Sequence, residues 1–449
     1  MAGSDRRGRS SRGRAGASGK AGKPGTSGAS VARRVRKGRV AASGAGTGAG
    51  AGRNGIDEAE ELSFGQYTGI RALLNPLWCY HGFRVAVAAL TGFGIIMVFS
   101  SSSVDMVSKG ASPFSQALSQ GVYCILGIVI ALIASRLPTR FYQRVSLGAV
   151  GVAMFLQVLT LTPLGTGGEE YGNSGWIAIG GFSMQPAEVV KFALCLWLPV
   201  GLRVSRKRFA KEGIMAYRWP AIVFLVCLGL VVAGRDVGTA LIIVAIGVAA
   251  FLIGGVPFKW FALGGVFVVV GILALVITSP NRMRRIMATY SDCTGADAQD
   301  VCFQSLHAKY AMASGGFLGV GIGNSREKWQ YLPAAHNDFI FAIIGEETGF
   351  VGASLVILLF VVLGWCMVAV ALQTRDRYVS MALVCITVWF VGQGLVNIGV
   401  VVGVFPVLGV PMPFVSAGGS SLIMCLAAAG VVCAMMRTQP QIKASLARV

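Results

Sequence analysis

Acidic side chains stand at the start of an apolar run in the segment "YLPAAHNDFIFAIIGEE", residues 331–347. Asp338 follows His336, and Glu346 and Glu347 come eight and nine residues after Asp338. Charged groups at the edge of a membrane are costly and usually functional, and a carboxylate at a low-dielectric boundary suits a general base. Asp338 is therefore the candidate base, with a helix N-cap as the alternative. Glu346, about 12 Å further along a helix, is too far away to share a proton, so Glu346 and Glu347 are interpreted as groups that hold helices together.

A lysine and a glutamate lie three residues apart in "GGFSMQPAEVVKFAL", residues 180–194. Glu188 and Lys191 then share one face of a helix that Pro186 can begin. The spacing allows two interpretations. The pair is either an internal ion pair, or Lys191 meets a phosphate while Glu188 orients the ammonium group.

Two further stretches carry polar groups between apolar runs. In "GRDVGTA", Asp236 is placed to cap a helix, and Arg235 is an outward cation. In "PFVSAGGSSL", Ser416, Ser420 and Ser421 precede an apolar run. Their hydroxyls are expected to cap a helix whose N-terminus favours an anion.

These groups together suggest the chemistry of a lipid with a phosphate-rich head. Lys309 and Lys328 add two cations, although loop lysines are usually only solvated. The glycines in residues 315–323 do not make a dinucleotide loop, because no strand precedes them and no Gly-Lys-Ser/Thr follows. They are expected to form tight turns. The sequence carries no Walker motif, zinc pattern or nucleophile–base triad.

The composition predicts that a membrane protein positions these groups. The chain of 449 residues is 54% hydrophobic and 13% charged, with a mean hydropathy of +0.68, and a soluble domain carries about twice that charge. A spanning helix needs about 20 apolar residues. An even number of spans puts both termini on one side, and the Lys and Arg residues between spans place that side in the cytoplasm. We predict an all-α polytopic membrane protein with ten transmembrane helices, at about 83–102, 116–135, 145–163, 187–204, 219–234, 237–255, 259–279, 338–372, 379–403 and 418–437.

Three parts make up the predicted domain organisation. Residues 1–75 are expected to be a disordered basic cytoplasmic tail, because they are rich in Arg, Lys, Gly and Ser and cannot bury enough surface to fold. We expect this tail to meet anionic lipid or partner proteins rather than nucleic acid. Residues 83–437 form the membrane domain, with a large structured extracytoplasmic loop at 280–337 between helices 7 and 8. Residues 438–449 form a short cytoplasmic tail.

The large loop contains its own structural signals. Residues 299–314 are predicted to form an amphipathic helix at the membrane surface. Cys293 and Cys302 lie nine residues apart on the side expected to be oxidising, where they could form a disulfide. Two free thiols are the alternative.

The order of several motifs resembles the SEDS family (shape, elongation, division and sporulation) over about residues 85–437. Besides the stretches already quoted, "QSLHAKYAMASGGFLGVGIGNSREKWQ" and "GLVNIGVVVGVFPVLGVPM" carry the resemblance. It implies a ten-helix peptidoglycan glycosyltransferase that polymerises lipid II, a disaccharide-pentapeptide on undecaprenyl pyrophosphate, at the outer face of the cytoplasmic membrane. The FtsW branch, active in division, is favoured over the RodA branch, active in elongation.

The resemblance also assigns roles to residues of this chain. Asp338 is the implied catalytic residue, taking a proton from the 4-hydroxyl of the acceptor sugar. Cations would meet the charge of the departing pyrophosphate, and a divalent cation, Mg²⁺ or Mn²⁺, could assist them. The residues expected to bind substrate are Lys191, Glu188, Arg235, Lys309, Lys328, Trp176, His336, Ser416 and Ser420.

The sequence departs from the family pattern in two places. In "YGNSGW", Trp176 is kept, but Ser174 and Gly175 stand where arginines are usual, which removes cations near the expected site. Ala417 stands where a tyrosine is common.

The implied partners are a class B penicillin-binding protein, which is a transpeptidase, and other divisome proteins at the septum. A lipid II flippase or transporter is the main alternative, because charged groups in broken helices also mark substrate pathways. A scaffold without activity is the third hypothesis.

Overall fold

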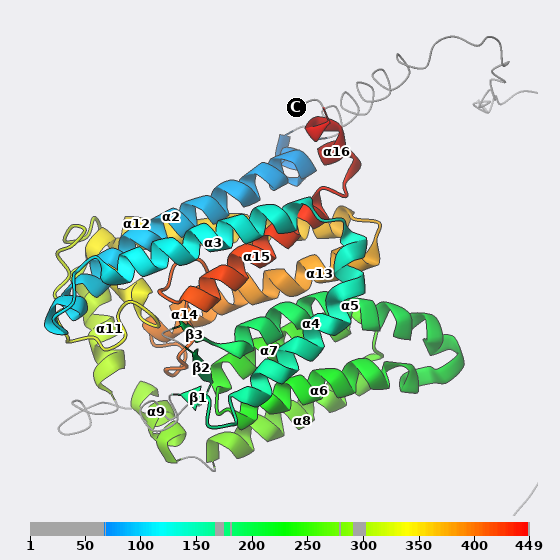
Figure 1. The fold of residues 1–449 in the computed structure, drawn as a ribbon, viewed down its shortest axis with the longest axis horizontal. Helices are drawn as coiled ribbons and strands as arrows, with labels where there is room; N and C mark the ends of the chain where they lie inside the picture. The colour runs from blue at the N-terminus through cyan, green and yellow to red at the C-terminus, as the bar shows by residue number, and fades with distance from the viewer. Residues whose placement is uncertain are drawn as a thin grey trace, which may run out of the picture. The chain divides into compact units, whose positions relative to one another are not determined.

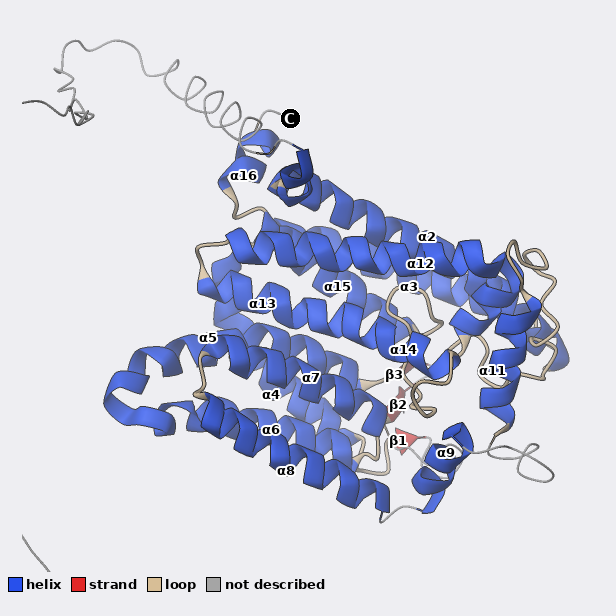
Figure 2. Cartoon of the chain, turned by 180° about the vertical axis from the view of Figure 1, so that it is seen from behind, coloured by secondary structure: helices blue, strands red, loops and turns tan. Residues whose placement is uncertain are grey.

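The computed structural model describes residues 67, 69–166, 175–179, 182–277, 280–290 and 302–447. These residues form a bundle of long helices with one small sheet at one end (Figures 1 and 2). The long helices are α2 (Pro76–Ser108), α3 (Ser115–Arg136), α4 (Thr139–Leu159), α5 (Pro186–Glu212), α6 (Arg218–Ala233), α7 (Val237–Gly254), α8 (Phe258–Ile277), α12 (Ile340–Gln373), α13 (Arg377–Thr387) with its continuation, and α15 (Gly419–Met436).

Shorter elements join the long helices. A π-helical turn η3 (Val388–Gly392) continues α13 into α14 (Gln393–Val401). Strands β1 (Gly165–Thr166), β2 (Trp176–Ile179) and β3 (Phe182–Met184) form an antiparallel sheet in that order. The remaining elements are η1 (Gly69–Leu74), η2 (Gly213–Tyr217), α9 (Pro280–Tyr290), α11 (Phe303–Ser314) and α16 (Pro440–Leu446).

The helices are apolar and long enough for a membrane protein, as predicted. Eight stretches within the described residues meet the length and hydropathy of a membrane span, and one of them, Pro186–Ala233, contains both α5 and α6. Each of the ten predicted spans coincides with one of the long helical stretches. The number that cross the membrane stays a prediction, because α8 has only a shorter apolar section, Phe258–Gly271.

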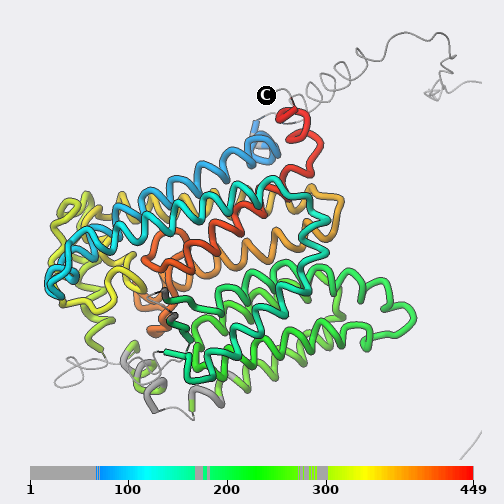
Figure 3. The backbone as a smooth tube through the Cα atoms, in the orientation of Figure 1, coloured from blue at the N-terminus to red at the C-terminus, as the bar shows by residue number. Residues whose placement is uncertain are grey.

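Burial separates the centre of the bundle from its lipid-facing rim. Within α15, 78% of the most apolar 18 residues are buried, compared with 22% in α3. Figure 3 shows α15 (red) running between α3 and α13, and it packs against both. Leu118 and Ile125 on α3, and Phe267 on α8, leave large apolar side chains exposed. Apolar surfaces of this extent are unusual on soluble proteins and suit contact with lipid.

The two ends of the bundle differ in structure. We call the end that carries the sheet, α11 and the segment leading into α12 the loop end. The opposite end, which carries α16 and the α12–α13 connection, is the tail end (Figure 1). Several helices begin where the sequence predicted. Pro186 is the first residue of α5, and the Asp236 side chain caps α7 by accepting from Thr239 N at 3.0 Å.

The helix α12 is broken near the loop end. Gly349 has φ 66° and ψ −165°, which is not helical and requires a glycine. The glycine-rich loop after α11 supplies hydrogen bonds that the break leaves open: Val320 N and Gly321 N donate to the carbonyls of Glu346 and Glu347, while Phe350 N and Val351 N donate to the carbonyls of Gly316 and Phe317. The turn interpretation of these glycines is therefore confirmed.

Close contact explains why glycines stand in this loop. A Cβ atom on Gly319 would lie 2.2 Å from Glu347 O, and one on Gly315 would lie 2.0 Å from Gly345 O. Larger residues would push the loop away from α12.

Three expectations need correction or restriction. Residues 69–74 of the predicted disordered tail form η1, and Trp365 Nε1 donates to Leu73 O at 2.9 Å, which ties η1 to α12. The first long helix begins at Pro76 rather than at residue 83. The helix expected at 299–314 is α11, which packs against α12 and α14 rather than only against a membrane surface. Residues 1–66 of the tail lie outside the described residues.

Candidate functional site

The segment of residues 336–338, which we call the Asp338 loop, leads into α12 and is held by its main chain. Two other segments donate hydrogen bonds to its consecutive carbonyls. The donors are Asn397 Nδ2 to Asp338 O at 2.8 Å, Ser416 Oγ to Asn337 O at 2.6 Å, and Ala417 N to His336 O at 2.9 Å. Asn397 lies on α14, and the other two donors lie just before α15. Backbone position in this loop is therefore fixed by elements far away in the sequence.

The side chain of Asp338 is only partly buried. Its carboxylate lies near the connection between α14 and α15, because a Cβ atom on Gly409 would be 3.6 Å from Asp338 Oδ2. Helix α12 begins at Ile340, and its N-cap is Phe339. Asp338 therefore does not cap the helix, and the helical spacing between Asp338 and Glu346 does not apply.

Two non-glycine residues with positive φ lie beside the Asp338 loop and beside the segment that bonds to it. Ala334 has φ 55° and Phe414 has φ 67°. Such backbone costs about 1–3 kcal/mol and persists where the surroundings enforce it, often at functional sites. Phe414 is buried, its ring lies 4.9 Å from Phe390, and a Cβ atom on Gly94 of α2 would touch its carbonyl at 2.6 Å.

Ser416 and Ser420 contact distant segments instead of capping α15. The N-cap of α15 is Gly418, with no side-chain hydrogen bond, so the expected serine cap is wrong. Ser420 Oγ accepts from Gln185 N at 3.2 Å, and Gln185 Nε2 donates to Asp236 Oδ2 at 2.7 Å. Three of the predicted polar stretches therefore meet at the loop end.

Lys191 and Glu188 form an ion pair inside the bundle. Lys191 Nζ lies 2.9 Å from Glu188 Oε1 and 2.6 Å from Gln393 Oε1, and both charged side chains are essentially unexposed. The π-helical turn η3 brings Trp389 beside them, with its ring centroid 5.3 Å from Lys191 Nζ. The ion-pair interpretation is thus what the structure shows, and a direct contact with substrate stays a prediction.

This buried pair is connected to the Asp338 loop. Gln393 Nε2 donates to Pro411 O at 2.7 Å, and Asn397, one turn further along α14, donates to Val410 O at 2.8 Å. The same Asn397 amide holds Asp338 O. The segment at 410–411 therefore bridges the ion pair and the candidate base.

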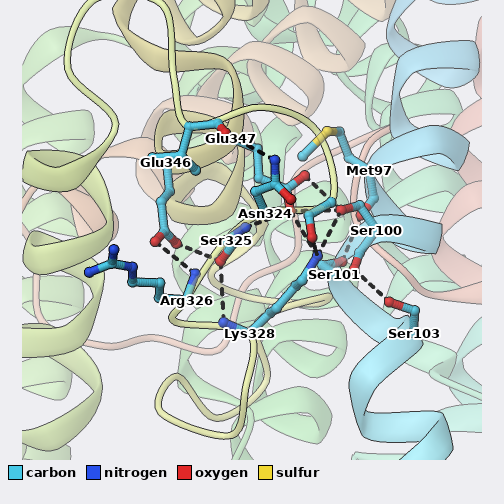
Figure 4. Close-up of polar contacts among 12 residues, drawn as sticks. Met97, Ser100, Ser101, Ser103, Asn324, Ser325, Arg326, Lys328, Glu346 and Glu347 are labelled. Carbon is cyan, nitrogen blue, oxygen red and sulfur yellow. Dashed lines mark hydrogen bonds and ion pairs between the residues drawn. The ribbon is translucent and has the colours of Figure 1, made fainter.

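Lys328 belongs to a second buried polar cluster, shown in Figure 4. Its ammonium group contacts Glu347 Oε1 at 3.2 Å and donates to Gly323 O at 2.5 Å. Ser100 Oγ on α2 donates to Glu347 Oε2 at 2.6 Å. Lys328 thus neutralises a buried carboxylate, and its predicted role in binding substrate is untested.

Glu346 holds the same loop from the neighbouring position. Its Oε1 atom accepts from Arg326 N at 2.9 Å, and its other oxygen accepts from the Ser325 hydroxyl. The interpretation that Glu346 and Glu347 hold the structure together agrees with these contacts. They tie the long loop to α12 and, through Ser100, to α2.

The other predicted residues lie around the loop end. Arg235 is exposed in the turn between α6 and α7, with φ 61°. Lys309 is exposed on α11, where its Nζ would be 3.2 Å from a Cβ atom on Gly403. Trp176, partly exposed, stands on β2 opposite Thr166 of β1.

The state of Cys302 agrees with the predicted disulfide. Cys302 is disulfide-bonded, whereas Cys79 and seven other cysteines of the described residues are free. Cys293, its predicted partner, lies outside the described residues, so the pairing itself stays a prediction.

Electrostatics at the Asp338 loop favour a neutral histidine. Burial lowers the pKa of His336, with Asp105 acting to raise it and Lys109 to lower it. Across the described ranges, no three His, Cys, Asp or Glu side chains are grouped so as to hold a metal ion. We therefore assign no step to the expected divalent cation.

Sequence reasoning missed the amides that position the site. Asn397, Gln393 and Gln185 are buried, and each donates to a group of another segment. Asn397 and Gln393 stand inside an apolar run, where a polar side chain is expensive and usually functional. That signal could have identified them.

The sequence of this chain matches a family model and several curated relatives. The family model of the cell cycle proteins FtsW, RodA and SpoVE matches residues 81–441. A Mycobacterium tuberculosis protein named "Probable peptidoglycan glycosyltransferase FtsW" is 33% identical over 373 residues, 83% of this chain and 70% of the relative. Stage V sporulation protein E of Bacillus subtilis is 35% identical over 350 residues, 76% of this chain and 93% of the relative.

Solved structures agree with the sequence relatives. The rod shape determining protein RodA of Thermus thermophilus aligns with a TM-score of 0.58 at 26% identity, over 80% of this chain and 96% of that chain. A chain from a peptidoglycan synthase complex, whose structure concerns the coordination of polymerization and crosslinking, aligns with a TM-score of 0.63 at 25% identity, over 79% and 97% of the two chains. This chain belongs to the FtsW, RodA and SpoVE family of polytopic membrane proteins.

Proposed function

We propose that this chain is a peptidoglycan glycosyltransferase that polymerises lipid II, with Asp338 as its general base. The observation that carries the proposal is the Asp338 loop. Its carbonyls are fixed by Asn397, Ser416 and Ala417, while the Asp338 carboxylate is only partly buried. A base that is held through its main chain and reached from outside is suited to proton transfer at a fixed position.

The reaction has one proton transfer and one displacement. The Asp338 carboxylate takes the proton of the acceptor's 4-hydroxyl as that oxygen attacks the anomeric carbon of the donor. The bond to the pyrophosphate oxygen breaks, and undecaprenyl pyrophosphate leaves. The exposed cations Arg235 and Lys309 are candidates to stabilise its charge. Lys191 and Lys328 are already paired with carboxylates, so their contribution would require these pairs to open.

The cellular setting is part of the proposal. Both termini would lie in the cytoplasm and the loop end outside it, at the division septum. The likeness to a synthase complex supports a class B penicillin-binding protein as the transpeptidase partner. Relatives named FtsW at 33% identity support the division branch. Further divisome partners are part of the proposal only.

Transport of lipid II is the competing function. The buried ion pair of Glu188 and Lys191 inside the bundle is the feature that favours it, since charges at depth can mark a substrate path. The polar contacts of the Asp338 loop favour chemistry at the surface instead. A scaffold without activity would need neither arrangement.

The deciding experiment uses the purified full chain with its transpeptidase and labelled lipid II. We expect Asp338→Asn to lower the rate of glycan polymerisation by about 10²–10⁴-fold, the usual contribution of a general base. Glu212→Gln, which removes an exposed carboxylate at the end of α5, is the matched control and should stay near the wild-type rate. Full-speed polymerisation by Asp338→Asn would refute the proposal. Movement of lipid II across liposomes without polymer would establish the transporter.

A further inference from the structure

A cavity of about 560 Å³ lies at the tail end, remote from the Asp338 loop. It is formed by the end of α5, the end of α7 and the connection from α12 to α13. Its polar lining has five cations and a single carboxylate: Arg203, Arg206, Lys207, Arg375, Arg377 and Asp376.

The single carboxylate is already engaged. Asp376 Oδ1 lies 3.5 Å from Arg203 Nη1, and the same atom caps α13 by accepting from Tyr378 N at 2.9 Å. The charge of Arg206 is offset by a helix end instead of a carboxylate. A Cβ atom on Gly255, which caps α7, would lie 3.0 Å from Arg206 Nη1. Its guanidinium therefore rests at the C-terminus of α7, where a cation is favourable.

Three positive charges remain without a counterpart. The side chains of Lys207, Arg375 and Arg377 have no hydrogen bond or ion pair with any other part of the chain that the structure describes. Arg377 is also the first residue of α13, where the helix dipole disfavours a cation. An anion in the cavity would offset both the uncompensated charges and this unfavourable placement.

The other wall of the cavity is apolar. Leu202, Ile253 and Met381 line it. Leu252 and Val248, which are 54% and 44% exposed, continue the apolar surface along α7. The cavity therefore joins a lipid-facing surface to a cluster of cations. A small soluble anion would use only the cationic wall, whereas an amphiphile with an anionic head would use both.

We propose that this cavity binds the phosphate head of an anionic phospholipid from the leaflet at the tail end. Basic pockets between membrane helices at the cytoplasmic side bind such heads. The acyl chains would lie along α7, and the phosphate would sit between Lys207, Arg375 and Arg377. The occupied site would hold α5, α7 and α13 together. This inference is independent of the proposed reaction.

Native mass spectrometry of the full chain tests the proposal, after release from nanodiscs of equal phosphatidylglycerol and phosphatidylcholine. We expect wild type to retain phosphatidylglycerol in preference to phosphatidylcholine. Each of the changes Lys207→Gln, Arg375→Gln and Arg377→Gln should reduce this preference about fivefold, since a cation near a lipid surface contributes about 1 kcal/mol. Arg208→Gln is the matched control, because Arg208 is exposed on α5 but does not line the cavity.

Two results would overturn the proposal. One is an equal loss of phosphatidylglycerol in the Arg208 variant, which would mean a general surface charge effect. The other is thermal stabilisation of detergent-purified protein by inorganic phosphate that matches that by phosphatidylglycerol and vanishes in the cavity variants, which would identify a soluble anion site. Gel filtration and melting curves confirm that each variant is folded.

Discussion

Two carboxylate-bearing segments lie close together in the chain at the loop end, and they differ in burial and in how their main chains are held. In the Asp338 loop, consecutive carbonyls receive hydrogen bonds from two other segments, and the Asp338 side chain stays partly exposed. At Glu346 and Glu347, the carboxylates themselves receive hydrogen bonds, and both residues are 1% exposed. The first arrangement presents an acidic group, whereas the second uses acidic groups as structural anchors.

The contrast indicates why one carboxylate can act as a base while its neighbours in the chain serve as structural anchors. A buried carboxylate with a lysine and several donors around it is occupied by these contacts and cannot be reached by a sugar hydroxyl. A base needs a fixed position and access to its substrate at once. Fixing the main chain and leaving the side chain accessible meets both needs.

The largest effect on stability is expected at the buried anchor. Glu347→Ala would leave the Lys328 ammonium group buried without its carboxylate, and breaking such a pair costs about 3–5 kcal/mol. We expect a large fall in melting temperature in detergent, measured by intrinsic fluorescence, and release of the loop from α12. Limited proteolysis around residues 323–328 would detect that release.

A double variant separates charge from shape at this anchor. Glu347→Gln combined with Lys328→Met removes both charges and should recover much of the stability lost in Glu347→Ala, because no charge is left unpaired. If the double variant is as unstable as Glu347→Ala, the ion pair is not what matters here, and the contrast between the two segments fails.

A smaller effect, seen mainly in the rate, is expected at Asn397. Asn397→Ala removes the donors to Asp338 O and Val410 O, each about 1–3 kcal/mol when a buried acceptor is left open. The base would then move within its loop. We expect kcat for polymerisation to fall about tenfold to a hundredfold, with a smaller change in KM. Asn324→Ala removes an exposed amide that bonds within its own loop and should change neither value.

Ser416 should have a milder effect of the same kind. Its hydroxyl donates to Asn337 O and accepts from Met412 N, so Ser416→Ala should cost about 1 kcal/mol and lower kcat severalfold. Ser103 on α2 bonds only to a carbonyl of its own helix, and Ser103→Ala should stay within about 0.5 kcal/mol of wild type. Equal effects of the two changes on kcat would show that Ser416 has no special role in positioning.

The sequence predicted the long helices because their signal is local. Apolar runs, Pro186 at a helix start and Asp236 at a cap can each be read within a few residues. The partners of Lys191 illustrate the limit. Glu188, three residues away, was predicted, but Gln393, 202 residues away, was not.

The functional environment of Asp338 depends on long-range packing of the same kind. Asn397 lies 59 residues and Ser416 lies 79 residues from the carbonyls that they hold. The break in α12 at Gly349 was also not predicted, because hydropathy averages over one glycine. A single sequence supplies the residue types of such a site but not the contacts that decide which carboxylate is exposed.

The smallest effect concerns pH and His336. Because burial lowers its pKa below the usual 6.5, the native state binds fewer protons than the unfolded state between these two values. The stability that neutral His336 contributes is therefore fully present above about pH 6.5 and is lost as the pH falls through its lowered pKa. We expect melting temperatures measured from pH 7.5 down to pH 5 to fall less steeply in His336→Gln than in wild type.

The control for this prediction is His81→Gln, since His81 is exposed on α2. It should leave the pH dependence unchanged. Because the carbonyl of His336 is one of those fixed in the Asp338 loop, a proton on its ring would act on the segment that presents the base, so polymerisation should weaken over the same acidic range. An identical pH dependence of stability in wild type and His336→Gln would mean that the histidine is not held neutral, and that only the main chain of this loop is constrained by its surroundings.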